Sequence, residues 1–184
     1  MCILFTGSEG SVAVRILKLA LLALLIVSIA PISEAALPKQ GNIVVIVHGQ
    51  VDSATINYVE NIIINRLLGN GYKVVDRELQ ARIRREQAAR LALDGNVEAI
   101  MKLGSRFGYS TLLSVQIAVR HRSDNYGFHG ATASIIAKAN ATSNGSIIYA
   151  ETVSSKEEKG FSNDEVVQLA VESVSLLAAN RMVD

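Results

Sequence analysis

The chain has 184 residues, of which 49% are hydrophobic, 19% charged and 5% aromatic, with a formal net charge of +1 at pH 7. This length is enough for one domain with its own core. The near-neutral charge gives no electrostatic case for nucleic acid or anionic lipid as a general partner. The only cysteine is Cys2, which excludes an intrachain disulfide.

The first 35 residues have the pattern of a secretory signal. Arg15 and Lys18 precede an uncharged apolar stretch at residues 19–30, and we expect cleavage between Ala35 and Ala36. A helix needs about 20 apolar residues to cross a ~30 Å hydrocarbon core, so this stretch is short for a span. The sequence therefore predicts export with no stable membrane anchor after cleavage.

Residues 1–13 form an unusual extension in front of such a signal, because they delay its basic residues. One explanation is that translation starts near Val12 or Val14, so that residues 1–13 are not made. The expected mature part, residues 36–184, keeps 16 basic and 15 acidic residues and has no cysteine to acylate. We therefore expect a soluble periplasmic protein built as a single domain.

The first third of the mature part is typical of strands that alternate with helices. Residues 42–48 are a continuous β-branched apolar run, which predicts a strand covered on both faces. Asp52 or Ser53 is placed to cap a helix that ends at residues 69–71. Residues 72–75 then predict a short second strand.

A helix capped by Asp76 is expected to follow, and to continue to residue 93. Leu79, Ile83 and Leu91 share one apolar stripe of this helix. Oppositely charged side chains lie four residues apart on its other side, at Glu78/Arg82, Arg82/Glu86 and Glu86/Arg90.

A third amphipathic helix is predicted at residues 97–107. Its Gly104 would allow close approach to whatever lies beneath it, and Gly108 would end it. The apolar positions of this helix are Val97, Ile100, Met101 and Phe107.

The period of the apolar residues then changes from about 3.6 to 2. Residues 113–119 and 133–141 both alternate between apolar and polar or small side chains. Asn144-Gly145 is a strong hairpin signal and leads into a strand at residues 147–153. These three strands are expected to form an antiparallel meander.

The chain is expected to end in a solvated connection and a helix. Residues 155–163 are rich in charge, and Ser162 or Asn163 is placed to cap the helix. The residues expected to face inward are Val166, Val167, Ala170, Val174 and Leu177.

These elements predict an α/β fold of the α+β two-layer kind. Their order is βαβααβββα, and the simplest closure is a mixed five-stranded sheet with helices packed on it. No internal repeat and no linker divides residues 36–184.

The loop at residues 122–130 is the candidate contact surface. It places Tyr126 and Phe128 among glycines at the end of two long strands, flanked by Arg122 and His129. Aromatic side chains on a hairpin bury a large area at a small entropic cost when they bind a partner. The alternative is that both rings fold back onto the sheet.

An enzyme is a further hypothesis. The strand that ends in His48-Gly49 is similar to the one before the oxyanion hole of α/β-hydrolases, but the nearest match to a nucleophile elbow, residues 108–112, lacks the second glycine. His121 and His129 flank one loop and could approach each other, yet no third metal ligand is evident. We therefore assign no catalytic residue, metal site or cofactor.

The segment Gly71-Tyr72-Lys73-Val74-Val75-Asp76-Arg77-Glu78-Leu79, with Ile83 and Glu86-Gln87 after it, resembles a family pattern: a short strand ending in Val-Asp-Arg, then Leu, Ile and Glu-Gln on a helix. The pattern is that of the curli-secretion channel subunit (CsgG-like) superfamily, which includes lipoprotein activators of penicillin-binding proteins and flagellar assembly proteins of the envelope. Residues 103–109 and 144–148 fit the same pattern. The likeness spans most of residues 42–180.

The resemblance implies a non-enzymatic envelope domain that works through protein contacts. The chain departs from the family because it has no lipid-bearing cysteine and no segment for the membrane hairpins of a channel. We therefore expect a periplasmic accessory or assembly protein with a protein partner. A homo-oligomeric secretion ring, or a small hydrolase or metal-dependent enzyme around His48 or His121/His129, is the alternative.

Overall fold

The computed structural model describes residues 36–124 and 126–184, all of which belong to one compact unit. The predicted signal at residues 1–35 and the proposed late start of translation lie outside the described residues.

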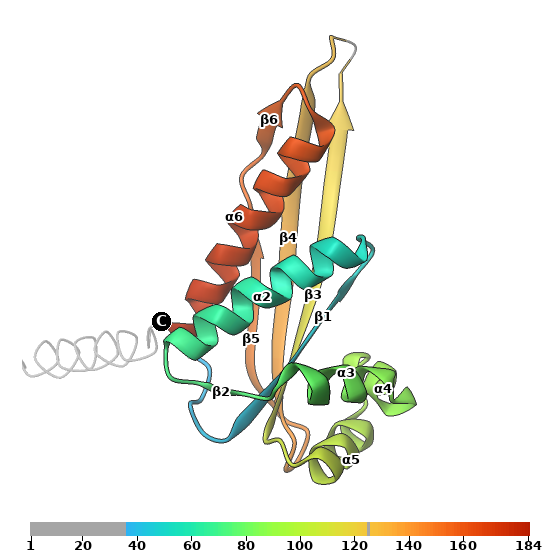
Figure 1. Cartoon of the computed structure of the whole chain (residues 1–184), viewed down its shortest axis with the longest axis vertical. Coiled ribbons are helices and arrows are strands. Elements are labelled where there is room, and N and C mark those ends of the chain that lie inside the picture. The colour runs from blue at the N-terminus through green and yellow to red at the C-terminus, as the bar shows by residue number, and fades with distance from the viewer. Residues whose placement is uncertain (1–35, 125) are drawn as a thin grey trace, which may run out of the picture. The chain divides into compact units, whose positions relative to one another are not determined.

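Eleven helices and strands follow one another along the described part of the chain (Figure 1). They are β1 (Asn42–Gly49), α2 (Ser53–Gly69), β2 (Lys73–Val74), α3 (Arg77–Arg85), α4 (Gln87–Leu93), α5 (Val97–Phe107), β3 (Thr111–Ser123), β4 (His129–Ala141), β5 (Ile147–Ser154), β6 (Glu158–Gly160) and α6 (Asn163–Val183).

The strands form one mixed sheet in the order β2-β1-β3-β4-β5, which confirms the predicted fold class. β1 runs parallel to both β2 and β3. β3, β4 and β5 form the predicted antiparallel meander, with Val115 opposite Ala137 and Ala137 opposite Glu151.

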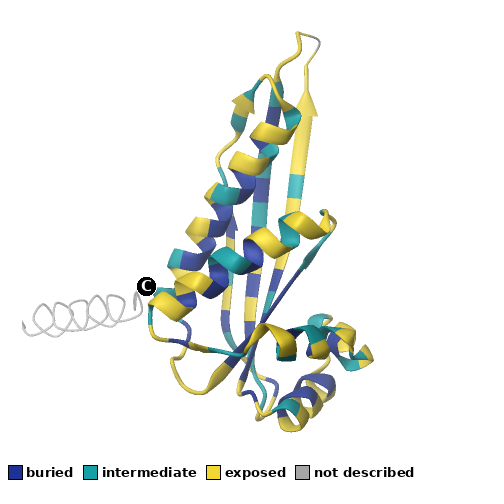
Figure 2. Ribbon diagram, in the orientation of Figure 1, coloured by how far each residue is buried: buried dark blue, intermediate teal, exposed yellow. Residues whose placement is uncertain are grey.

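Both faces of β1 are covered, as its continuous apolar run predicts. Ile43, Val45 and Val47 belong to the core beneath α2 and α6. Val44 and Ile46 belong to a second core beneath α3, α4 and α5. Figure 2 shows the buried sides of the helices turned toward the sheet.

Side-chain oxygens cap the helices where the sequence places them. Asp52 accepts a hydrogen bond from the backbone N–H of Thr55 at 2.8 Å and so caps α2. Ser162 caps α6 by accepting from the backbone N–H of Glu165. Of the two candidates for each cap, the structure therefore selects Asp52 and Ser162.

α6 packs on the sheet through small side chains, and this corrects the prediction for Leu177. Ala170, Ala178 and Ala179 are buried against a sheet that is itself rich in buried alanines. Small residues on both surfaces let the helix approach closely, and the larger Leu177 remains exposed on the outer side.

α6 is also the one helix among residues 36–124 and 126–184 with the length and apolar character of a membrane span. Its inner face is covered by the sheet and α2, with Val166 and Val174 fully buried. In this structure it is a core helix.

The predicted single helix at residues 77–93 is wrong, because the chain breaks between α3 and α4. Glu86 has φ −71° and ψ 135°, an extended conformation, and Leu91 is exposed and lies outside the predicted stripe. The break frees Glu86 to pair with Arg106 of α5 at 2.8 Å. It also leaves Ala89 and Ala92 to pack against α5.

The predicted ion pairs four residues apart along this region do not form among the described residues. Arg84 of α3 instead pairs with Glu60 of α2, whose carboxylate is almost buried. These charges therefore tie separate helices together.

The predicted connection at residues 155–163 contains a sixth strand, β6. Its residues Glu158–Gly160 pair with His129–Ala131 of β4. β6 lies at an edge of the sheet, where its side chains reach solvent. An edge strand of this kind can be charged and needs no alternation of apolar residues, so the sequence pattern does not reveal it.

Candidate functional site

The candidate contact surface lies where β3 and β4 continue beyond β1. β1 pairs with β3 only as far as Ile117, whereas β3 and β4 pair up to Ser123 and His129. The two strands therefore project as a ribbon that carries the turn at its end (Figure 1). We use the name hairpin tip for residues 122–124 and 126–130 together with residues 157–161.

Asp124 holds the turn of the hairpin tip in shape. Its Oδ1 accepts hydrogen bonds from the backbone N–H groups of Tyr126 at 2.8 Å and Phe128 at 2.9 Å. Its own N–H donates to the carbonyl of Phe128 at 2.9 Å. Gly127 has φ +82°, a conformation that glycine adopts without strain. The turn is thus preorganised by local hydrogen bonds.

Three aromatic side chains are exposed at the hairpin tip. Tyr126 is 87% exposed, Phe128 47% and Phe161 75%. The rings of Phe128 and Phe161 lie 4.6 Å apart, centroid to centroid. Of the two alternatives for the predicted aromatics, the structure therefore shows rings turned outward. Phe161 was missed, because nothing local in the sequence places it beside a loop 33 residues earlier.

A shared carboxylate organises the charges of the hairpin tip. Glu157 lies 3.2 Å from Arg122 Nε through Oε1 and 3.2 Å from Lys159 Nζ through Oε2. A β-carbon on Gly130 would lie 2.9 Å from Glu157 Oε1, so the absence of a side chain there makes room for the carboxylate. These residues line a hollow of about 380 Å³.

The structure brings His121 and His129 together, as their positions in the loop allowed. Their rings stack with centroids 6.3 Å apart and an angle of 19° between planes. Within residues 36–124 and 126–184, however, no group of three or more His, Cys, Asp or Glu side chains is arranged to hold a metal ion. The pair is therefore short of ligands for an ordinary metal site.

His48, the other histidine of the enzyme hypothesis, lies far along the sheet from this pair. Its Nε2 lies 3.2 Å from Ser114 Oγ. Burial lowers the pKa of His48 below its ordinary value, and the carboxylate of Asp94 opposes this effect. A serine, a histidine and a carboxylate are thus present in one region.

This arrangement lacks the other parts of an acyl-transfer site. Ser114 lies in the middle of β3, which pairs there with β1 on one side and β4 on the other. The neighbouring amides are engaged in the sheet and are not free to stabilise an oxyanion. Ser110 of the elbow-like segment donates its Oγ–H toward the carbonyl of Asn42, at 3.1 Å. The hydrolase hypothesis therefore gains no support.

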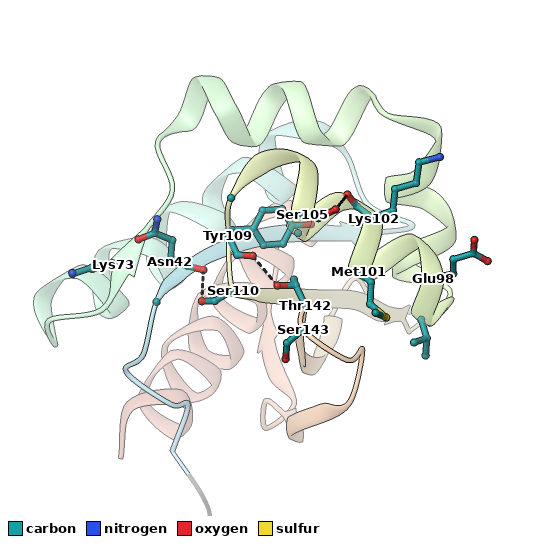
Figure 3. Close-up of a pocket in the computed structure, with 14 residues that line it drawn as sticks. Asn42, Lys73, Glu98, Met101, Lys102, Ser105, Tyr109, Ser110, Thr142 and Ser143 are labelled. Carbon is teal, nitrogen blue, oxygen red and sulfur yellow. Dashed lines mark hydrogen bonds between the residues drawn. The ribbon is translucent and has the colours of Figure 1, made fainter.

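A second hollow, of about 1290 Å³, lies between α5, the start of β1 and the turn after β4 (Figure 3). Thr142 Oγ1 donates to the carbonyl of Tyr109 at 2.7 Å, which fixes one wall. Lys73, Glu98 and Lys102 lie apart on its rim (Figure 3). The hollow is broad and its charged groups do not converge on one point.

No protein-family model and no curated protein matches this chain. The resemblance to the CsgG-like superfamily therefore stays a prediction.

Several solved structures are similar to it in fold. Lipoprotein GNA1162 from Neisseria meningitidis is 17% identical over 77% of this chain and 99% of that one, with a TM-score of 0.48. The PelC dodecamer from Paraburkholderia phytofirmans is 12% identical over 82% and 95%, with a TM-score of 0.45. The LpoB C-terminal domain from Salmonella enterica is 10% identical over 71% and 91%, with a TM-score of 0.38. The proposals below rest on the described residues of this chain alone.

Proposed function

We propose that this chain is a non-enzymatic accessory or assembly protein of the bacterial cell envelope, and that it binds a protein partner through the hairpin tip. The observation that carries the proposal is the exposure of Tyr126, Phe128 and Phe161, which lie together at the end of the β3–β4 hairpin. The envelope location follows from the export signal predicted for residues 1–35.

The hairpin tip has the amino-acid composition of a binding hot spot. Tyrosine, phenylalanine and arginine are enriched in protein interfaces, and a few of them supply most of the binding free energy. The hydrogen bonds to Asp124 hold the turn before any partner arrives. A preorganised turn loses little conformational entropy on binding, so more of the contact energy remains as affinity.

The charged side chains of the hairpin tip could form the polar rim of a protein–protein interface. Arg122 and Lys159 line the same hollow as Phe128, and both pair with the carboxylate of Glu157. Rim charges of this kind contribute to specificity and to the rate of association more than to affinity.

Photo-crosslinking in intact cells tests the proposal. A photoreactive amino acid at position 126 should form a reproducible adduct with a protein partner, and one at position 147, which is exposed on β5, should not. Tyr126→Ala/Phe128→Ala should also weaken capture of the same partner about 30-fold or more, which corresponds to a loss of about 2 kcal/mol at a binding hot spot.

The matched control removes two exposed apolar side chains elsewhere. Leu91→Ala/Ile147→Ala should leave capture unchanged, because both side chains are exposed away from the hairpin tip. Retention of every partner by the Tyr126→Ala/Phe128→Ala variant would refute the proposed contact surface.

A further inference from the structure

The edge of β3 beyond β1 is open. Ile117 is the last residue of β3 that pairs with β1, and residues 118–123 pair on their other side with β4. Within the described residues no strand continues the line of β1 past Gly49. We call residues 118–123 the open edge. Figure 2 shows that the upper part of β3, which contains these residues, is mostly exposed.

The direction of the backbone groups along the open edge follows from the hairpin. The N–H of Asp124 donates to the carbonyl of Phe128, so the backbone groups of Asp124 point toward the opposite strand of the hairpin. In an antiparallel pair such positions alternate along the strand. The backbone N–H and C=O groups of Val119, His121 and Ser123 therefore point away from β4, toward the vacant position.

The side chains of the open edge differ between the two faces of the sheet. Arg120 and Arg122 lie on one face, and Val119 and His121 lie on the other. Arg122 shares Glu157 with Lys159, and Arg120 makes no ion pair with any residue that the structure describes. One face thus carries an excess of positive charge beside unpaired backbone groups.

We propose that the open edge binds an extended peptide segment in which acidic side chains alternate with apolar ones, added to the sheet as a strand beside β3. The inference rests on the proposed function and names the class of partner. Its acidic residues lie next to Arg120 and Arg122, and its apolar residues lie beside Val119. The backbone of the segment bonds to Val119, His121 and Ser123.

Charge excludes the simplest competing occupant, which is the same edge of a second copy. Antiparallel pairing of two open edges would bring Arg120 and Arg122 of one copy against those of the other. Like charges that face each other across paired strands destabilise the pair. The same arginines therefore protect the edge from self-association and favour an acidic strand.

A defined peptide tests the inference on the exported protein recovered from cells that express the full chain. The probe is Thr-Glu-Val-Glu-Val-Glu-Val-Thr, compared with a peptide that carries Lys for each Glu and with one that is N-methylated at alternate residues. Binding of the first peptide should slow amide hydrogen exchange at Val119, His121 and Ser123. The Lys peptide and the N-methylated peptide should bind at least about tenfold more weakly.

Charge reversal supplies the matched variants. Arg120→Glu/Arg122→Glu should lower the affinity for the acidic peptide about tenfold or more, whereas Lys73→Glu/Lys102→Glu, which makes the same change in net charge on exposed residues elsewhere, should change it less than about twofold. Exchange protection at other residues, or equal binding of the Lys peptide, overturns the inference.

The two proposals fail separately. If crosslinking at position 126 persists but the acidic peptide does not protect the open edge, strand addition is wrong and the hairpin tip remains the contact surface. If the peptide protects the edge but no adduct forms at position 126, the tip is wrong as the surface that meets the partner. If both fail, the proposed function falls with the inference.

Discussion

The rings of Phe128 and Phe161 lie 4.6 Å apart at an angle of 38°. Phe128 immediately precedes β4, and Phe161 immediately precedes the Ser162 cap of α6. Their contact ties the turn of the hairpin tip to the start of a core helix. Aromatic pairs of this kind contribute about 0.5–1.5 kcal/mol beyond the area they bury.

Phe161→Ala should therefore loosen the hairpin tip without unfolding the protein. We expect faster amide exchange at Tyr126 and Phe128, and a decrease of about 1 kcal/mol or less in the free energy of unfolding, because both rings are partly exposed. Native-state hydrogen exchange measures the first and urea unfolding the second. Leu176→Ala, at an exposed position of α6, is the control and should leave exchange at the tip unchanged. Unchanged exchange in Phe161→Ala would show that the contact does not support the turn.

Gly104→Ala should destabilise the protein, because α5 lies directly on the turn after β4. A β-carbon at position 104 would lie 2.2 Å from the β-carbon of Thr142, so helix or turn must shift. Overpacking of this kind costs about 1–3 kcal/mol. Gly69→Ala is the matched control, since a β-carbon there meets nothing within 4 Å. Urea unfolding should show a loss for Gly104→Ala and little change or a gain for Gly69→Ala; equal effects would contradict the packing described.

Removal of the hydroxyl group should change the free energy of unfolding in opposite directions at two buried tyrosines, Tyr109 and Tyr72. Tyr109 Oη makes no hydrogen bond within the described residues, and burial raises the pKa of Tyr109 to about 12. Tyr72 Oη donates to the carbonyl of Leu37 at 2.7 Å. Because an unpaired buried hydroxyl is costly, Tyr109→Phe should raise the free energy of unfolding by about 1 kcal/mol, whereas Tyr72→Phe should lower it by about 1 kcal/mol. Denaturant unfolding of both variants checks the signs, and a loss in Tyr109→Phe would show that its hydroxyl has a partner.

The half-buried His48 should make the free energy of unfolding depend on pH. Burial lowers its pKa in the folded protein below the ordinary value of 6.5, so around this pH the unfolded chain binds more protons. Its contribution to stability is complete above about pH 6.5 and is lost as the pH falls through the lower, folded-state pKa. His48→Gln should therefore lose less stability than the unchanged protein when the pH is lowered from about 7.5 to about 5.

Ser114→Ala serves as the control for this pH dependence. It removes the side-chain neighbour of His48 Nε2 but leaves the burial that lowers the pKa. We expect the Ser114→Ala variant to retain the pH dependence. An identical loss of stability in His48→Gln and the unchanged protein would mean that His48 does not contribute.

Features that depend on interactions between neighbouring residues were predicted correctly, and features that depend on distant residues were not. Caps, turns and strand alternation depend on neighbouring residues, and the structure confirms them at Asp52, Ser162 and the alternating residues of β3 and β4. The errors at Glu86, Leu177 and β6 share one cause. Each depends on a distant residue: Arg106 for the break, the alanines of β4 for the helix face, and His129–Ala131 for the edge strand.

The candidate contact surface shows the same division. Tyr126, Phe128, Arg122 and His129 are neighbours in the chain, and the sequence by itself determined that they share one hairpin. Only the tertiary structure decided that Phe161 stacks on that turn and that the line of β1 stops short of it, leaving β3 open. The physical reason is that local periodicity shows which side chains are buried. Which distant residue or strand lies beside a given segment depends on how the whole chain packs.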